Sequence, residues 1–295
     1  MNVLVLGSGL MGTQIGCDYA LGGHHVTLVG RSGPRVALRL KAVISELRAC
    51  ELIDECAVTG LTSRIGISTS LDIEGREFDM VVESLPEEFP LKSRWLSEAG
   101  SRYESAILAS NTSSLSIANL GAASKAPERM IGTHYMNPPA LMPLVEVVAT
   151  VSTATEVCDR VTETLQDLGK TPIHVKRDVP GFVWNRLQSA LLREALWLVQ
   201  HEVVSPEVVD QVFRQGLAPR WISTGPIETV ALGGVGVFQR LVENIWPDLS
   251  DAVDPDALET VIERRGLTPD DLQRLKQARD QALSRWVRRG DALSN

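Results

Sequence analysis

The sequence predicts an α/β fold, a doubly wound and mostly parallel sheet with helices on both faces, followed by an all-helical C-terminal domain. Short apolar runs alternate with helix-like stretches up to residue 175, which is typical of a parallel sheet. After Pro180-Gly181 this alternation stops, and the later segments have only helical periodicity. We therefore expect one domain over residues 1–179 and a second over residues 180–295.

The first strand runs into a glycine-rich turn. A strand-like run over residues 2–6 leads to Gly7-Ser8-Gly9-Leu10-Met11-Gly12, a helix-like stretch over 11–21 and a second strand-like run over 25–29. The glycines permit a tight turn, close approach of the backbone to a pyrophosphate and close packing of helix on strand. In this strand-turn-helix context the motif predicts a Rossmann-type, dinucleotide-binding domain.

The end of the second strand indicates which dinucleotide is bound. An NAD-binding domain usually has an acidic residue there for the ribose hydroxyls, but this chain has Gly30-Arg31-Ser32. An arginine and a neighbouring hydroxyl can bind a 2′-phosphate. We expect a preference for NADP; the alternative is NAD held by other contacts, with Arg31 an ordinary surface residue.

The next elements place polar residues at the carboxyl ends of strands, where open α/β sheets bind ligands. The pattern predicts a helix over 34–52, strands over 64–68 and 78–82, a helix over 88–100 and a strand over 106–109. Glu83 and then Ser110-Asn111-Thr112-Ser113-Ser114 follow two of these strands. The second run is either part of a cofactor crevice or a turn with a helix cap.

Two short β segments, residues 130–134 and 144–148, are joined by a connection containing Pro138-Pro139. Prolines are excluded from central strands, so the chain folds back and can bring Glu146 beside His134. A carboxylate on one imidazole nitrogen fixes the tautomer and makes the other nitrogen a better base. The alternative is a histidine that is simply hydrogen-bonded within a core.

The remaining segments complete the predicted order. A helix over 154–168 and a strand over 171–175 finish the first domain. The second domain is expected to consist of helices over residues 183–201, 206–216, 234–246, 255–265 and 269–289.

Composition excludes several classes of protein. The net charge of −8 argues against a nucleic-acid partner, which requires a basic face. The four cysteines are scattered without a disulfide or zinc spacing, so we expect no metal. No apolar run is long enough to cross a bilayer, and the chain starts on a strand without a leader. We expect no membrane association and a cytoplasmic protein.

These features resemble the L-3-hydroxyacyl-CoA dehydrogenase family over nearly the whole chain. The matching motifs are residues 7–12, 83–92, 110–114, 132–138, 144–147 and 180–187. The resemblance implies that His134 is the general acid or base, with Glu146 as its partner. It also implies that Ser113 and Asn185 bind the reacting oxygen, and that Glu83, Lys92 and Asn111 lie along the cofactor site.

The C-terminal part resembles one branch of this family. Residues 216–229 look more like lambda-crystallin and L-gulonate 3-dehydrogenase than like the CoA-using members. A free hydroxy acid needs a cation for its carboxylate, and Arg220 is the candidate because guanidinium binds carboxylates in a bidentate way. The alternative is a structural arginine paired with Glu228.

The expected activity is interconversion of an L-3-hydroxy acid, or its thioester, and the 3-oxo form by hydride transfer to or from NAD(P). The alternatives are a 3-hydroxyacyl-CoA dehydrogenase in the strict sense and a non-catalytic, crystallin-like nucleotide-binding protein. Leu187, Leu191, Leu192 and Leu196 give the helix over 183–199 more apolar surface than one neighbour requires. Together with the resemblance, this predicts a homodimer.

Overall fold

The computed structural model describes residues 1–73, 75–252 and 257–290. Contacts divide the chain into two compact units, which are described separately: unit 1 is Met1–Asn185 with Lys276–Asn295, and unit 2 is Arg186–Leu275. The expected division into domains near residue 179 stays a prediction.

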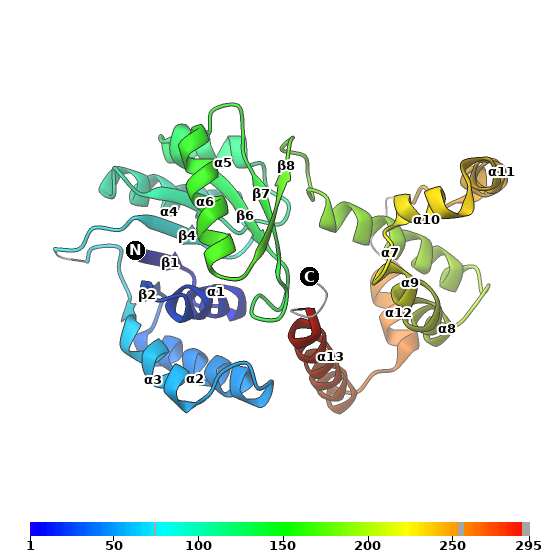
Figure 1. Cartoon of the computed structure of the whole chain (residues 1–295), viewed down its shortest axis with the longest axis horizontal. Coiled ribbons are helices and arrows are strands. Elements are labelled where there is room, and N and C mark those ends of the chain that lie inside the picture. Colours follow the sequence, from blue (N-terminus) through cyan, green and yellow to red (C-terminus); the bar gives the residue numbers. More distant parts are fainter. Residues whose placement is uncertain (74, 253–256, 291–295) are drawn as a thin grey trace. The chain divides into compact units, whose positions relative to one another are not determined.

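Unit 1 is built on one eight-stranded sheet (Figure 1) with the order β3-β2-β1-β4-β5-β6-β7-β8. β6 and β7 are antiparallel, and the other described neighbours are parallel. The fold class expected from the sequence is therefore confirmed. The strands are β1 Asn2–Leu6, β2 His25–Val29, β3 Ile65–Ser68, β4 Met80–Glu83, β5 Ile107–Ser110, β6 Met130–Tyr135, β7 Leu144–Val148 and β8 Thr171–Val175.

Helices cover both faces of this sheet. The helices between the strands are α1 Leu10–Leu21, α2 Gly33–Ala49, α3 Glu55–Arg64, α4 Phe89–Arg102, α5 Ile117–Ser124 and α6 Thr155–Asp167. Helices α3 and α5 were not predicted from the sequence. Glu83, expected just beyond a strand, is the last residue of β4.

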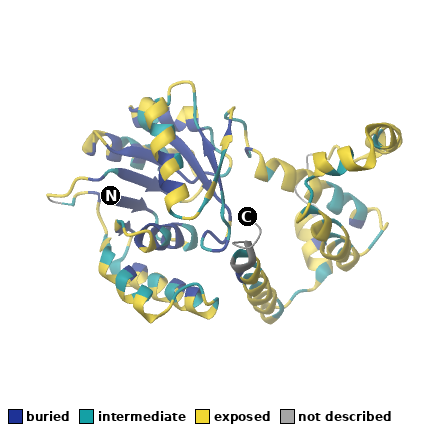
Figure 2. Ribbon diagram, in the orientation of Figure 1, coloured by how far each residue is buried: buried dark blue, intermediate teal, exposed yellow. Residues whose placement is uncertain are grey.

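The sheet core is apolar on both sides. Along β1, Val3 and Val5 pack into one cluster of buried residues, whereas Leu4 and Leu6 pack into another. Because successive side chains of a strand point to opposite faces, both faces must be covered, and β1 is accordingly a continuous apolar run. Figure 2 shows the central strands mostly as buried, whereas the edge strands β3 and β8 are mostly half-buried or exposed.

Unit 2 is helical. Its described segments are α8 Pro206–Val212, a π-helical stretch Phe213–Leu217, α9 Ala218–Trp221, α10 Pro226–Gly233, α11 Val235–Ile245 and α12 Ala257–Arg265. The helix predicted over 255–265 is described from Ala257 onward, and its first two residues lie outside the described ranges. Two further helices contribute to both units: α7 Trp184–Gln200 and α13 Pro269–Gly290. None of the described helices is long and apolar enough to span a bilayer.

Candidate active site

A histidine and a glutamate face each other across the antiparallel pair of strands. In the β6–β7 register His134 is directly opposite Glu146, and the imidazole Nδ1 lies 2.7 Å from the carboxylate Oε2. The two residues are 4% and 0% exposed. The fold-back predicted from the prolines has therefore produced a buried His–Glu contact.

Glu146 is held from a second side by the segment that follows Pro180-Gly181. Its Oε1 accepts hydrogen bonds from the backbone N–H of Val183 at 2.8 Å and of Trp184 at 2.9 Å. Burial alone would raise the pKa of Glu146, but the hydrogen bonds from His134 and from these two N–H groups outweigh burial and lower it. Glu146 is therefore a carboxylate at neutral pH.

The ionisation of Glu146 determines the tautomer of a neutral His134. A carboxylate can only accept hydrogen bonds, so Nδ1 carries the hydrogen and Nε2 keeps its lone pair. Nε2 lies 3.2 Å from the hydroxyl Oγ of Ser113. The ring of Phe182 is 5.6 Å from the imidazole, centre to centre, and is tilted against it by 56°.

Ser113 and Asn185 meet at the same place. The Asn185 side-chain Nδ2 donates to the backbone carbonyl of Ser113 at 3.3 Å. The residues expected to act together thus form one connected group: His134, Glu146, Ser113 and Asn185. This group forms although Ser113 and Asn185 are 72 positions apart in the sequence. Because Ser113 and Asn185 present a hydroxyl and an amide, the group can bind an oxygen that changes between hydroxyl and carbonyl.

The loop that carries Ser113 is fixed by Glu87, to which the sequence analysis assigned no role. Glu87 Oε1 accepts from the hydroxyls of Thr112 and Ser114 at 2.6 and 2.9 Å, and from the N–H groups of Ser113 and Ser114, each at 2.9 Å. Burial raises the pKa of Glu87, but bonds from residues 112–114 and the charge of Lys92 outweigh it and lower the pKa to about 2. No local feature of the sequence indicates these contacts, because the partners are 25–27 positions later in the chain.

Glu83 and Lys92 form a buried ion pair. Lys92 Nζ lies 2.7 Å from Glu83 Oε1 and 3.2 Å from Glu87 Oε2, and the Ser110 hydroxyl donates to Glu83 Oε2 at 2.6 Å. Glu83 and Lys92 are 0% and 1% exposed. The structure therefore pairs these two side chains inside the protein, and their expected place along the cofactor site stays a prediction.

Asn111 bridges two strands at the same edge of the sheet. Its Oδ1 accepts from the N–H of Tyr135 at 2.8 Å, and its Nδ2 donates to the Ser84 hydroxyl at 3.3 Å. Because both ends of the amide already have protein partners, Asn111 fixes β6 against the segment after β4. Its expected contact with a cofactor stays a prediction.

The glycine-rich turn fits a dinucleotide. A Cβ on Gly7, which has φ +107°, would lie 2.3 Å from the Ser84 carbonyl oxygen, and one on Gly12 would lie 2.0 Å from the Gly7 carbonyl oxygen. A Cβ on Gly9 would meet no protein atom within 4 Å. Gly7 and Gly12 thus allow neighbouring backbone segments to pack closely, whereas Gly9 leaves open space for the close approach of a pyrophosphate.

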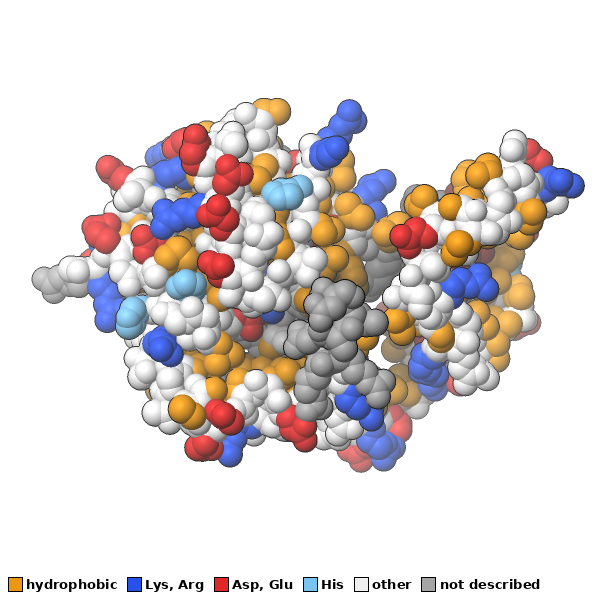
Figure 3. Space-filling view, viewed as in Figure 1, with side chains coloured by type: hydrophobic (Ala, Val, Ile, Leu, Met, Phe, Trp, Pro, Cys, Tyr) orange, Lys and Arg blue, Asp and Glu red, His pale blue; other side chains and the backbone are white. Residues whose placement is uncertain are grey.

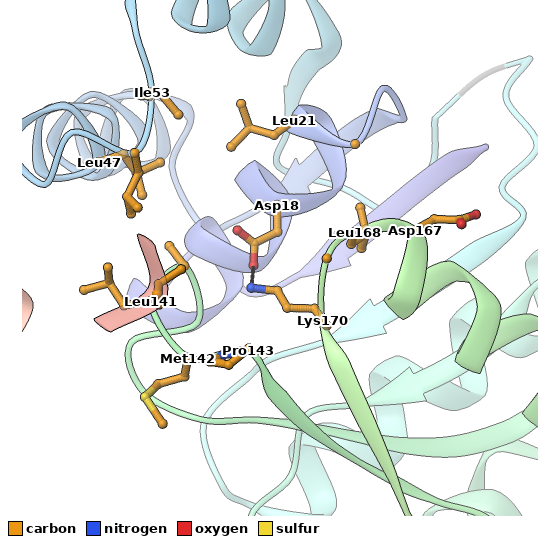
Figure 4. A pocket seen from close by; sticks show the side chains of 15 residues that line it. Asp18, Leu21, Leu47, Ile53, Leu141, Met142, Pro143, Asp167, Leu168 and Lys170 are labelled. Atoms are coloured by element: carbon orange, nitrogen blue, oxygen red, sulfur yellow. Dashed lines mark ion pairs between the residues drawn. The ribbon is translucent and has the colours of Figure 1, made fainter. Parts of the chain in front are cut away.

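Unit 1 has a pocket away from the group around His134. Figure 4 shows this pocket, which is lined by apolar side chains including Leu47, Leu141 and Leu168. Asp18 and Lys170 form an ion pair at its wall, with 2.8 Å between Oδ2 and Nζ. Because none of its lining residues belongs to the group around His134, this pocket is separate from the candidate active site.

Arg220 lies in unit 2, on the short helix α9. Among the residues described, it forms no ion pair, and Glu228 instead accepts from the backbone N–H of Gly225 at 2.8 Å. The alternative expectation, a structural Arg220–Glu228 pair, is therefore not found in this structure. The guanidinium remains available to a ligand.

Two family descriptions match consecutive parts of the chain. Residues 2–179 match "3-hydroxyacyl-CoA dehydrogenase, NAD binding domain", and residues 181–274 match the C-terminal domain of the same family. Together they cover nearly all of the sequence.

Individual relatives agree. The chain is 31% identical to 5-formyl-3-hydroxy-2-methylpyridine 4-carboxylate 5-dehydrogenase of Mesorhizobium japonicum, covering 88% of this chain and 84% of the relative. It is 30% identical to the human lambda-crystallin homolog, over 97% and 95% of the two chains. A crystal structure described as the former dehydrogenase, "an NAD+ dependent dismutase", superposes with a TM-score of 0.85 at 28% identity, over 98% and 97% of the chains.

Proposed function

The chain belongs to the 3-hydroxyacyl-CoA dehydrogenase family, and from that premise we propose that it interconverts an L-3-hydroxy acid, or its thioester, and the 3-oxo form, with His134 as acid and base. The family and the glycine-rich turn support a nicotinamide dinucleotide as the redox partner. The observation that supports the catalytic role most directly is the 2.7 Å contact between His134 Nδ1 and Glu146.

The side chains of the group have distinct roles in this proposal. In the oxidative direction, Nε2 of His134 takes the proton of the substrate hydroxyl, and Glu146 stabilises the positive ring that results. The Ser113 hydroxyl and the Asn185 amide hydrogen-bond the reacting oxygen, and Glu87 fixes the loop that presents Ser113. A bound nicotinamide supplies the hydride acceptor, and residues 7–12 hold the dinucleotide.

Replacing His134 tests this assignment. His134→Ala should lower kcat by roughly 10²–10⁴-fold, the usual contribution of general acid–base catalysis, while the Kd for the dinucleotide changes little. His174, which lies on β8 and contacts Cys158 and Thr162, provides the matched control, and His174→Ala should leave kcat nearly unchanged. Activity of His134→Ala equal to that of the wild type would remove His134 from the mechanism.

We also propose that the dinucleotide is NADP, with NAD as a weaker alternative. Gly30 leaves no carboxylate at the end of β2, and Arg31 and Ser32 follow it. An NADP-linked enzyme in a reducing compartment favours reduction, so 3-oxo to 3-hydroxy reduction is expected at least as much as oxidation. Steady-state kinetics with both cofactors decide this, because a clear preference for NADH over NADPH would contradict the role of Arg31.

The substrate class is proposed from unit 2. Arg220 has no ion-pair partner among the described residues, and this supports a free hydroxy acid, whose carboxylate it would bind. Arg220→Ala should raise KM for free 3-oxo acids about tenfold or more and leave KM for acetoacetyl-CoA unchanged. Efficient turnover of the thioester by the wild type, with no activity on free acids, would instead support the strict 3-hydroxyacyl-CoA dehydrogenase.

A homodimer and a cytoplasmic location remain part of the proposal.

A further inference from the structure

A basic segment surrounds the end of β2. No Asp or Glu occurs between Asp18 and Glu46, whereas Arg31, Arg35, Arg39 and Lys41 fall in this interval. The chain as a whole carries a net charge of −8. A positively charged segment in a chain of net negative charge produces a local positive field, which attracts anionic groups.

Among the described residues, no acidic side chain pairs with these cations. None of the four forms an ion pair in the part of the chain that the structure describes. Further along the same helix the situation differs: Arg48 lies 2.8 Å from Glu55, and Glu46 lies 3.1 Å from Lys276. The C-terminal part of α2 is thus neutralised within the protein, while its N-terminal part is not.

Gly30 is closely packed at the end of β2. A Cβ added to Gly30 would lie 2.2 Å from Ser8 Oγ and 2.5 Å from Val36 Cγ2. Contacts below 3 Å require a neighbour to move, so a side chain at position 30 would require both Ser8 and Val36 to shift. With glycine at this position, no carboxylate is present there to repel a 2′-phosphate.

Within this segment, Arg35 is placed to act with Arg31. Arg31 lies between β2 and α2, and Arg35 is in the first turn of α2, Gly33–Ala49. The Cα–Cβ bonds of a helix tilt toward its N-terminus, so the side chain of Arg35 begins in the direction of residues 31 and 32. Arg39 is exposed in the same way, but it is one turn later, about 6 Å further along the axis.

We propose that Arg35 is the second arginine of a site for the 2′-phosphate of NADP, of which Arg31 is the first. This inference rests on the proposed NADP preference. A phosphate monoester carries nearly two negative charges, which two guanidinium groups can neutralise with bidentate hydrogen bonds. Ser32, the N-cap residue of α2, makes no side-chain capping bond, and its hydroxyl is a further donor to the same phosphate.

Isothermal titration calorimetry with 2′,5′-ADP and with ADP tests the site without requiring turnover. The wild type should bind 2′,5′-ADP at least tenfold more tightly than ADP. Arg31→Ala and Arg35→Ala should each weaken 2′,5′-ADP binding by about 10-fold or more and leave ADP binding unchanged. Arg39→Ala, the matched control of equal charge and exposure, should change neither affinity more than about twofold. In kinetics, the first two variants should raise KM for NADPH but not for NADH.

The results distinguish the role of Arg35 from the NADP preference on which it rests. If Arg35→Ala behaves like Arg39→Ala while the wild type still prefers 2′,5′-ADP, the role of Arg35 is overturned and the NADP preference stands. If the wild type binds ADP as tightly as 2′,5′-ADP, both are overturned. Thermal melts of the three variants should agree with the wild type within about 2 °C, since exposed substitutions change stability little.

Discussion

Glu146 uses both carboxylate oxygens within the protein, one on His134 and one on two backbone N–H groups. The carboxylate therefore couples the orientation of the imidazole to the segment after Gly181. A glutamine amide in place of this carboxylate can make the correct hydrogen bonds on only one of these two sides. Its oxygen can still accept from Val183 and Trp184, but its NH₂ group then faces Nδ1 of the histidine.

Glu146→Gln should therefore reverse the tautomer of His134. With a donor facing it, Nδ1 must accept, so Nε2 carries the hydrogen and cannot take a proton from an alcohol. We expect kcat for oxidation to fall by roughly 10²–10⁴-fold, with little change in dinucleotide affinity. The exposed Glu128 gives the control variant Glu128→Gln, and a nearly unchanged kcat for Glu146→Gln would show that the carboxylate does not set the tautomer.

The close packing of Ser8 and Val36 around Gly30 can be tested by mutation. Gly30→Ala should lower the free energy of unfolding by about 1–3 kcal/mol, because its Cβ meets Ser8 and Val36 at overpacking distances. Gly33→Ala is the matched control, since a Cβ there meets nothing within 4 Å. Urea unfolding of the two variants gives the comparison. Equal stability would mean that Ser8 yields readily and that position 30 is open to larger side chains.

Strands were predictable where short runs of strand-forming residues lie between turn residues. Strands β1, β2, β7 and β8 have the predicted bounds, although β8 has only one buried residue. Helices α3 and α5 were missed for local reasons. Helix α5 is Ile-Ala-Asn-Leu-Gly-Ala-Ala-Ser, where Gly and Asn weaken helix propensity. Its start depends on the Ser116 cap on Asn119 N–H.

The candidate site was predictable only in part. Residues 134 and 146 lie on neighbouring strands of one fold-back, so their contact follows from local sequence. Glu87 contacts residues that are 25–27 positions later, and nothing in its own neighbourhood indicates this. The contact exists because β4 and β5 are adjacent and parallel, which brings the loops after them together.

The loop between β5 and α5 should respond to acid through Glu87. Its pKa of about 2 lies below the ordinary 4.5, so ionisation stabilises the fold above pH 4.5, and this contribution is lost as the pH falls from 4.5 toward 2. Glu87→Gln should therefore be less stable than the wild type at pH 7, and the difference should shrink at pH 3.5. Denaturant midpoints at both values measure it. Glu88→Gln, the adjacent exposed acid, is the matched control for removing one carboxylate at this place. A stability difference for Glu87→Gln that stays constant between the two pH values would contradict the assignment.

Over the full chain, the two units differ in how well their apolar residues are covered. The sheet of unit 1 buries its apolar side chains on both faces, whereas unit 2 leaves many of them exposed, among them Ile227 at 80% and Leu232 at 77%. Figure 3 shows hydrophobic side chains gathered over α10 and α11. On α7, Leu187 is 58% exposed and Leu192 44%. Apolar surface on this scale is typical of protein–protein interfaces.

We therefore expect a homodimer that forms through unit 2. Light scattering at micromolar concentration should give a mass near twice the 32.2 kDa of one chain. Leu187→Asp should shift the population toward monomer, because a buried and unpaired carboxylate opposes association. Val151→Asp is the matched control: Val151 is 106% exposed but lies in unit 1, so the mass should not change. A wild type that is monomeric at this concentration would refute the dimer, and a dimeric Leu187→Asp variant would place the interface away from this part of α7.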